Sequence, residues 1–186
     1  PAHPRISGTH FAMLPMSRKA LVVDDLIAER RKNLGDDLLS ELIRVEEDGE
    51  KLTVAEMIPQ VVGLLVAGFE TTIGLIGNGT RALIEHPDEM AKLRDDPSLI
   101  ENTVEECLRY DAPVRSIQRI ASEDVEVGGK MVRKDERLRW FISSANRDPE
   151  VFPNPDIFDI ARYPNPHVAS GSGIHHCLGS TLARLE

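Results

Sequence analysis

A cysteine inside a glycine-rich stretch is the part of this sequence whose residue types are best suited to chemistry. In "HVASGSGIHHCLG", residues 167–179, Cys177 follows His175 and His176 and lies among glycines. Glycines allow positive φ angles and let the backbone approach a flat ligand closely. A helical pattern starts just after the cysteine, and a helix N-terminus favours the thiolate form of a nearby cysteine.

Three interpretations of this stretch are open. Cys177 could be an inert buried thiol, a zinc ligand, or an axial thiolate ligand of haem iron. The first is the ordinary case, because free cysteine is among the most buried residue types. A structural zinc site needs four ligands of suitable geometry. Beyond His175, His176 and Cys177, no CxxC or HxxxH motif supplies the others. Zinc is therefore the least favoured of the three.

Spacing favours the haem interpretation. The residues at every second position are Gly171, Gly173, His175, Cys177 and Gly179. This spacing resembles the haem-binding loop of the cytochrome P450 family, whose pattern is Phe-Gly-x-Gly-x-His-x-Cys-x-Gly. Five of the six specified positions match, and Ser170 stands where the family has phenylalanine. The resemblance implies that Cys177 ligates the iron of haem b and that the glycines let the loop lie against it.

A second motif, "AGFETT" at 67–72, lies within a long apolar pattern. Taken alone, it is more typical of threonine bonding back to its own helix. It resembles the family's oxygen-binding groove, in which Ala67 and Gly68 leave room for the cofactor and a diatomic ligand. The resemblance further implies that Glu70 and Thr71 relay protons to bound oxygen.

A third motif, "EECLR", places Glu106 and Arg109 three residues apart, and therefore on one face of a helix. Such a pair alone is more typical of an exposed salt bridge. In this position it resembles the family's Glu-x-x-Arg pair, which ties the helix to a later irregular segment through a third basic residue. Arg162 and His167 are both candidates for that third residue.

Two basic residues are candidates for binding the haem propionates. Arg119 resembles the family's propionate-binding arginine, and a guanidinium suits a charge-assisted contact with a carboxylate. His175 is the second candidate, whereas His176 occupies a variable position and is expected to have no role. Arg139 and Trp140 are unusual in the family's strand, and a buried arginine needs partners, so an exposed strand face is one expectation.

Composition limits the classes of partner. The chain has 186 residues, 41% hydrophobic and 28% charged, with a formal net charge of -9. This acidity argues against nucleic acid, whose affinity for proteins depends on clustered Lys and Arg. No uncharged apolar run of membrane-spanning length occurs, and the first residues lack a signal pattern, so we expect no membrane partner and a cytoplasmic location. Cys107 and Cys177 are not expected to form a disulfide.

The pattern along the chain predicts a mainly α fold with a small β region. Residues 1–19 show no clear period. Apolar spacing and caps predict helices at 20–32, 36–47, 53–86, 87–96 and 97–110. The helix over 53–86 starts with a Thr53–Glu56 capping box and is expected to be buried on several faces. A hairpin at Gly128–Gly129 and a strand in "LRWFI" follow, and then an irregular proline-rich segment.

The resemblance covers about residues 20–186 and matches the C-terminal part of the fold in the soluble bacterial type, with residues 1–19 unassigned. We expect the chain to be truncated at both ends relative to the family. The family implies a monooxygenase that inserts one atom of dioxygen into a small organic substrate. Its electrons would come from a ferredoxin or flavin protein, and NAD(P)H would act only through that partner. The alternatives are a peroxide-driven peroxygenase and a non-catalytic fragment that retains no haem.

Overall fold

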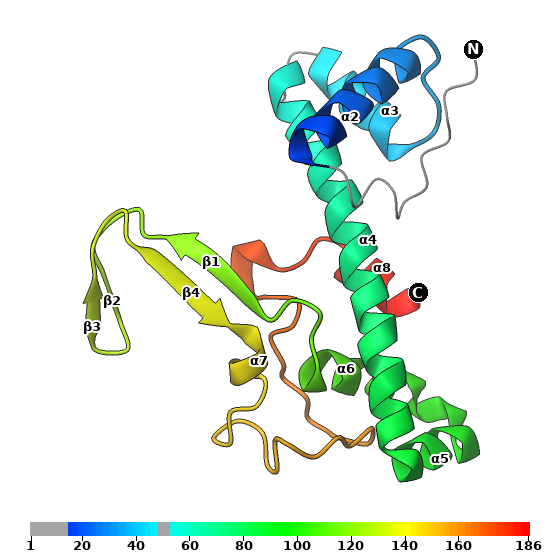
Figure 1. Ribbon diagram of the computed structural model, residues 1–186, viewed down its shortest axis with the longest axis vertical. Coiled ribbons are helices and arrows are strands. Elements are labelled where there is room, and N and C mark those ends of the chain that lie inside the picture. The colour runs from blue at the N-terminus through cyan, green and yellow to red at the C-terminus, as the bar shows by residue number, and fades with distance from the viewer. Residues whose placement is uncertain (1–14, 48–52) are drawn as a thin grey trace. The chain divides into compact units, whose positions relative to one another are not determined.

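The computed structural model describes residues 15–47 and 53–186, in two compact units that meet between Glu70 and Thr71. Helices predominate in both units, and the strands form only two small sheets (Figure 1). The predicted mainly α fold with a small β region is confirmed. Each unit has its own hydrophobic core.

The first unit contains α2 (Met16–Arg30), α3 (Leu38–Glu47) and the beginning of α4 (Val54–Glu85). The two helices predicted on either side of Gly35 are confirmed. Because α2 begins at Met16, the prediction that residues 16–19 have no regular structure is wrong, and residues 1–14 lie outside the described part. The buried side chains of this core are Val23, Ile27, Ile43, Met57, Val61 and Val62.

The capping box at the start of α4 is confirmed. The Thr53 N–H donates to the Glu56 carboxylate at 2.9 Å, and the Glu56 N–H donates to the Thr53 hydroxyl at 3.3 Å. The first bond satisfies a backbone donor that has no partner within the helix, and the second adds to the bond from the Glu56 N–H to the Thr53 carbonyl at 3.0 Å. The helix therefore begins at Val54, and Pro59 lies inside it.

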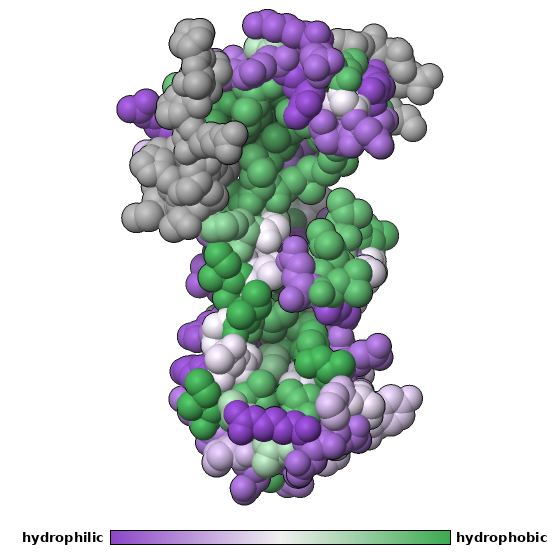
Figure 2. Space-filling model, turned by 90° about the vertical axis from the view of Figure 1, so that its right-hand side faces the viewer, coloured by the Kyte–Doolittle hydropathy of each residue, from purple (hydrophilic) through white to green (hydrophobic). Residues whose placement is uncertain are grey.

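The prediction that α4 is buried on several faces is wrong for the described residues. Its exposed large apolar side chains are Leu64, Leu65, Ile73, Ile76 and Ile84, and Figure 2 shows hydrophobic surface along this helix. By length and composition, its residues Ala55–Glu85 could cross a membrane, although core helices of water-soluble proteins have the same properties. These side chains of α4 are exposed because the other described elements pack against only part of the helix.

The second unit continues α4 and adds α5 (Pro87–Asp95), η1 (Pro97–Leu99) and α6 (Ile100–Tyr110). α5 follows the bounds predicted for 87–96 closely, whereas the single helix predicted over 97–110 is divided into η1 and α6. Its core consists of Leu75, Ala82, Cys107, Leu108, Phe158 and Ile160. At the contact between α4 and α6, a Cβ atom on Gly79 would lie only 3.0 Å from the Cys107 sulfur. Glycine at position 79 thus permits close approach of the two helices.

Two antiparallel strand pairs follow α6. β1 (Ser116–Ile120) pairs with β4 (Arg137–Phe141), and β2 (Val125–Val127) pairs with β3 (Lys130–Val132). The predicted hairpin is confirmed: Gly128 and Gly129 join β2 to β3 with φ angles of 56° and 74°, as a two-residue turn with two positive φ angles requires. Arg139 and Trp140 in β4 are exposed, which confirms the exposed strand face.

The end of the chain is largely irregular, as predicted. After the short α7 (Ile142–Ala145), residues 146–167 form what we call the meander, which has neither helix nor strand. Residues 168–179, the cysteine loop, contain one 3₁₀ turn, η2 (Gly173–His175). The helix predicted after the cysteine is α8 (Ser180–Leu185). The meander and the loop therefore depend on side chains and on the core for their shape.

Candidate cofactor site

Backbone hydrogen bonds fold the cysteine loop back on itself. The Cys177 N–H donates to the Ser170 carbonyl at 2.8 Å, and the Gly171 N–H donates to the Val168 carbonyl at 2.9 Å. Gly171 and Gly173 have φ angles of 70° and 64°, a region that strongly favours glycine. The two glycines thus allow the tight path that brings Ser170 and Cys177 together.

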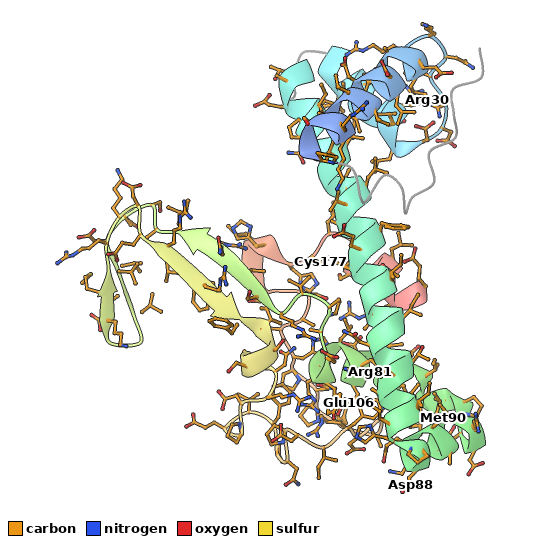
Figure 3. The ribbon with its side chains drawn as sticks, viewed as in Figure 1. Arg30, Arg81, Asp88, Met90, Glu106 and Cys177 are labelled. Carbon is orange, nitrogen blue, oxygen red and sulfur yellow. The ribbon has the colours of Figure 1, made fainter. Side chains whose placement is uncertain are left out.

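Cys177 is exposed at the end of this loop (Figure 3) and forms no disulfide. Three large apolar side chains around it are also exposed: 98% of Ile174, 91% of Leu178 and 62% of Leu182. An exposed thiol among exposed apolar side chains suits a large apolar ligand, because binding would remove those side chains from water.

The space beside the loop is open. Cβ atoms added at Gly173 and Gly179 would meet no atom within 4 Å, and one at Gly171 would approach only the His175 carbonyl, at 3.3 Å. The described residues include no group of three or more His, Cys, Asp or Glu side chains placed to hold a metal ion. A flat ligand that brings its own metal, such as haem, fits this arrangement of one thiol, open space and apolar neighbours.

The two candidates for propionate binding are exposed. Arg119 lies on β1, where its Nη1 donates to the Gln118 carbonyl at 2.8 Å, and His175 lies in η2. The ring of His176, which was expected to have no role, contacts the Gly171 carbonyl at 3.3 Å and the Ser180 hydroxyl at 3.1 Å. His176 therefore joins the loop to the first residue of α8.

The "AGFETT" residues lie in an unbroken part of α4. Ala67 and Gly68 are exposed, and a Cβ atom added at Gly68 would meet nothing within 4 Å. Glu70 is also exposed, and Thr71 is half-buried. The exposed carboxylate of Glu70 avoids the desolvation cost expected of a charge within an apolar helix.

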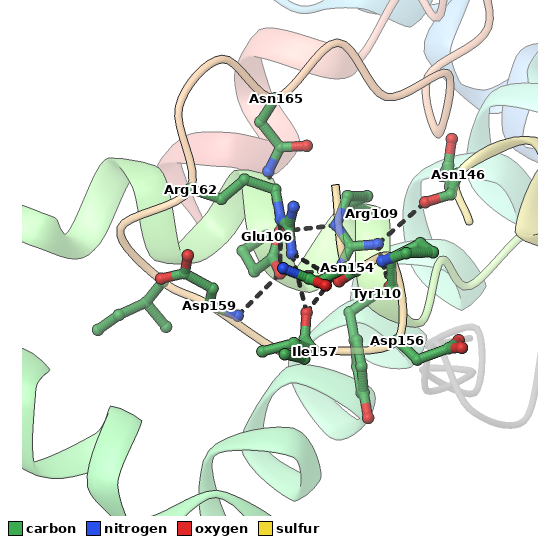
Figure 4. A network of polar contacts seen from close by, with 12 residues as sticks. Glu106, Arg109, Tyr110, Asn146, Asn154, Asp156, Ile157, Asp159, Arg162 and Asn165 are labelled. Atoms are coloured by element: carbon green, nitrogen blue, oxygen red, sulfur yellow. Dashed lines mark hydrogen bonds and ion pairs between the residues drawn. The ribbon is translucent and has the colours of Figure 1, made fainter. Parts of the chain in front are cut away.

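Glu106 and Arg109 of α6 form a fully buried ion pair, with both side chains 0% exposed. Arg109 donates to the two carboxylate oxygens through Nε and Nη2, each at 2.8 Å. Of the two candidates for the third basic residue, Arg162 contacts Glu106 at 3.2 Å, whereas His167 contacts Glu105 at 2.9 Å. Figure 4 shows Glu106, Arg109 and Arg162 together with residues of the meander, among them Asp159 and Asn165, and we call this group the Glu106 network.

The remaining bonds of the network attach the meander to α6. Arg109 donates to the carbonyls of Asn146, Pro155 and Ile157 at 2.7–3.0 Å. With the two bonds to Glu106, all five guanidinium donors are used. Glu106 also accepts from the Asp159 N–H at 2.9 Å and from the Asn165 side chain at 3.0 Å. An irregular segment is thereby held by a buried charged centre.

Several residues of this site were not predicted from the sequence. Asn146 is fully buried, and its side-chain oxygen accepts from the Val168 N–H at 2.9 Å, at the start of the cysteine loop. Asn165 binds Glu106, and Glu105 binds His167. The only sequence signal was the doubled glutamate of "EECLR", which gives no indication of partners so distant along the chain.

Comparison with known proteins identifies relatives for almost the whole chain. A family model described as "Cytochrome P450" matches residues 13–186. The chain is 46% identical over 162 residues to the biotin biosynthesis cytochrome P450 of Bacillus subtilis, covering 87% of this chain and 41% of that protein. It is 46% identical over 163 residues to 6-deoxyerythronolide B hydroxylase of Saccharopolyspora erythraea, covering 87% and 40%.

Solved structures of similar proteins agree with these sequence matches. CYP109E1 from Bacillus megaterium, solved with testosterone, has a TM-score of 0.88 and 39% identity, covering 91% of this chain and 44% of that one. P450BioI, solved with an acyl carrier protein that carries hexadec-9Z-enoic acid, has a TM-score of 0.84 and 43% identity, with coverage of 91% and 44%. The chain thus spans less than half the length of these relatives.

Proposed function

Since this chain belongs to the cytochrome P450 family, we propose that its parent protein is a haem-thiolate monooxygenase that inserts one atom of dioxygen into an organic substrate. The observation that carries the proposal is the exposed Cys177, held at the end of its glycine loop among exposed apolar side chains. Residues 20–186 then form part of a single P450 domain. The rest of that domain covers the apolar side chains that α4 exposes.

Each predicted site residue has a part in this function. When bound, haem b supplies a thiolate-ligated iron at which dioxygen is activated. Cys177 holds the iron, and the guanidinium of Arg119 and the ring of His175 bind the propionates. Ala67 and Gly68 leave room beside α4. The Glu70 carboxylate and the Thr71 hydroxyl hold and pass protons to bound oxygen.

The partners follow from the same proposal. Electrons come from a ferredoxin or a flavin protein, and NAD(P)H acts only through that donor, because "VGGK" lacks the other positions of a phosphate-binding loop. The substrate is a small organic molecule. We further propose a cytoplasmic location in a bacterium, with α4 as a core helix of the complete domain and with neither membrane nor nucleic acid as a partner.

An absorbance spectrum tests the proposal directly. The chain is mixed with haem, reduced and treated with carbon monoxide, and we expect the red-shifted band specific to thiolate-ligated haem. Absence of this band would contradict haem-thiolate function for this chain and would favour the non-catalytic fragment.

The proton relay is tested by Thr71→Ala, with Thr72→Ala as the matched control on the same helix. Loss of the Thr71 hydroxyl is expected to lower the fraction of electrons that appear in product by about tenfold, because removing a proton-transfer group costs at least that much. The lost electrons are expected to appear as peroxide or water. Product yield and electron consumption are measured together. Equal coupling in both variants would contradict the relay, whereas turnover with peroxide but none with a reductase would favour a peroxygenase.

A further inference from the structure

Outside the Glu106 network, a second polar cluster centres on Glu105, the neighbouring residue of α6. The ring nitrogen Nε2 of His167 lies 2.9 Å from its carboxylate, and Nη2 of Arg184 lies 3.1 Å from the same oxygen. Arg184 also donates to the other carboxylate oxygen through Nε. His167 directly precedes the cysteine loop, and Arg184 lies in α8 after it. A single carboxylate of α6 therefore holds both sides of the loop.

The contacts of the His167 ring favour its neutral form. It is 3% exposed, and Nδ1 accepts from the Ala169 N–H at 3.3 Å. With Nδ1 as acceptor, the proton is on Nε2, which then donates to Glu105. A neutral ring satisfies both contacts. In agreement, burial is the largest influence on this ring and lowers the pKa of His167, against the opposing effect of Glu105.

Arg184 connects the same carboxylate to the helix that follows Cys177. Its Nη1 donates to the Ser180 carbonyl at 3.0 Å in the first turn of α8. The hydrogen bond with Glu105 is the largest cause that raises the pKa of Arg184, and interaction with Cys177 adds to it.

We propose that Glu105, His167 and Arg184 form a clasp that fixes both ends of the cysteine loop to α6 and so positions Cys177. These are positioning residues, because none of them is assigned a contact with the cofactor. Their consequence for haem rests on the proposed function, whereas the fixed loop is a property of the haem-free chain. The two can therefore be tested separately.

Amide hydrogen exchange in the haem-free chain tests the clasp. His167→Phe keeps a ring but removes both polar contacts, whereas His167→Gln retains a donor near the position of Nε2. We expect His167→Phe to raise exchange in residues 168–183 by about tenfold, since local opening controls exchange. His167→Gln is expected to stay close to the unmodified chain. A loop that exchanges equally in all three proteins would overturn the proposal.

Glu105→Gln provides a second variant, with Glu89→Gln as the matched control. Like Glu105, Glu89 pairs with a cation, in this case Lys92. It also accepts from the Ile160 N–H at 3.2 Å, so it binds the meander rather than the cysteine loop. Only Glu105→Gln is expected to raise exchange in the loop. An equal rise in α5 would mean that Glu105 stabilises the whole unit, and the proposal would be wrong.

The loaded chain gives a spectroscopic readout. We expect His167→Phe to lower the fraction of bound haem that shows the red-shifted band with carbon monoxide, and His167→Gln to restore it. An unchanged fraction in His167→Phe would overturn the role of the clasp in positioning Cys177. If the unmodified chain binds no haem, the proposed function fails, while the exchange experiment still decides whether the clasp exists.

Discussion

Arg109→Met is expected to lower the free energy of unfolding by about 3–5 kcal/mol, the usual cost of removing one partner of a buried ion pair. Arg109 is fully buried, and its five donors are all bonded, two to Glu106 and three to carbonyls of the meander. Methionine fills similar space but satisfies none of these acceptors. Each buried acceptor that loses its partner adds to the cost.

Arg133→Met is the matched control for this experiment. Arg133 pairs with Asp124 at 2.7 Å, but the two side chains are 67% and 49% exposed. Water screens such a pair, so this variant is expected to leave stability almost unchanged. Denaturant unfolding followed by circular dichroism measures both. Similar losses in the two variants would show that the Glu106 network does not hold the meander.

A double variant separates the ion pair from the carbonyl contacts. Glu106→Gln combined with Arg109→Met should cost less than the sum of the two single changes, because each single change already removes the same contact between Glu106 and Arg109. Arg162 retains its bonds to the carbonyls of Pro153 and Ile157 in either case. Strict additivity would mean that Glu106 and Arg109 act independently.

The parts of the fold that were predicted correctly depend on short-range chemistry. The Thr53–Glu56 capping box, the turn at Gly128–Gly129 and the start of α5 at Pro87 each arise within a few residues. Local side-chain bonds and allowed φ angles decide such features, so their sequence patterns are specific. The hairpin and the helix starts at these positions could therefore be derived without knowledge of the packing.

The partners in the site depend on contacts distant in sequence. A spacing of three residues predicted that Glu106 and Arg109 share a helix face, but equally suited an exposed pair. Their burial depends on Asp159, Arg162 and Asn165, which lie 53, 56 and 59 residues from Glu106. The meander that carries these residues has no periodic pattern, so sequence could not choose between Arg162 and His167.

The prediction that α4 is buried on several faces failed for the same reason, because burial also depends on contacts distant in sequence. Its apolar residues occur around most of the helix, which is typical of a buried element, yet Ile73 and Ile76 are each 55% exposed. The composition of a helix shows how much of its surface is apolar. Whether that surface is buried depends on which other elements pack against it. A chain that spans about two-fifths of its relatives' length leaves part of that requirement unmet.

Cys177→Ala is expected to abolish the red-shifted band of the reduced, carbon-monoxide-treated chain completely, because alanine offers no ligand to iron. Cys107→Ala is the matched control. Cys107 is buried in the core, and burial, with a smaller effect of Glu106, raises the pKa of its thiol to about 12. At neutral pH that thiol stays protonated, and it cannot replace the thiolate.

The two cysteine variants together identify the ligand. We expect Cys107→Ala to keep the band and to lose only the stability that a small core cavity removes, whereas Cys177→Ala loses the band even if some haem stays bound to the apolar loop. Total bound haem and the thiolate band are measured on the same samples, so weak binding is distinguished from changed ligation. An unchanged band in Cys177→Ala would exclude Cys177 as the ligand. The assignment of the loop, and with it the proposed monooxygenase, would then be wrong.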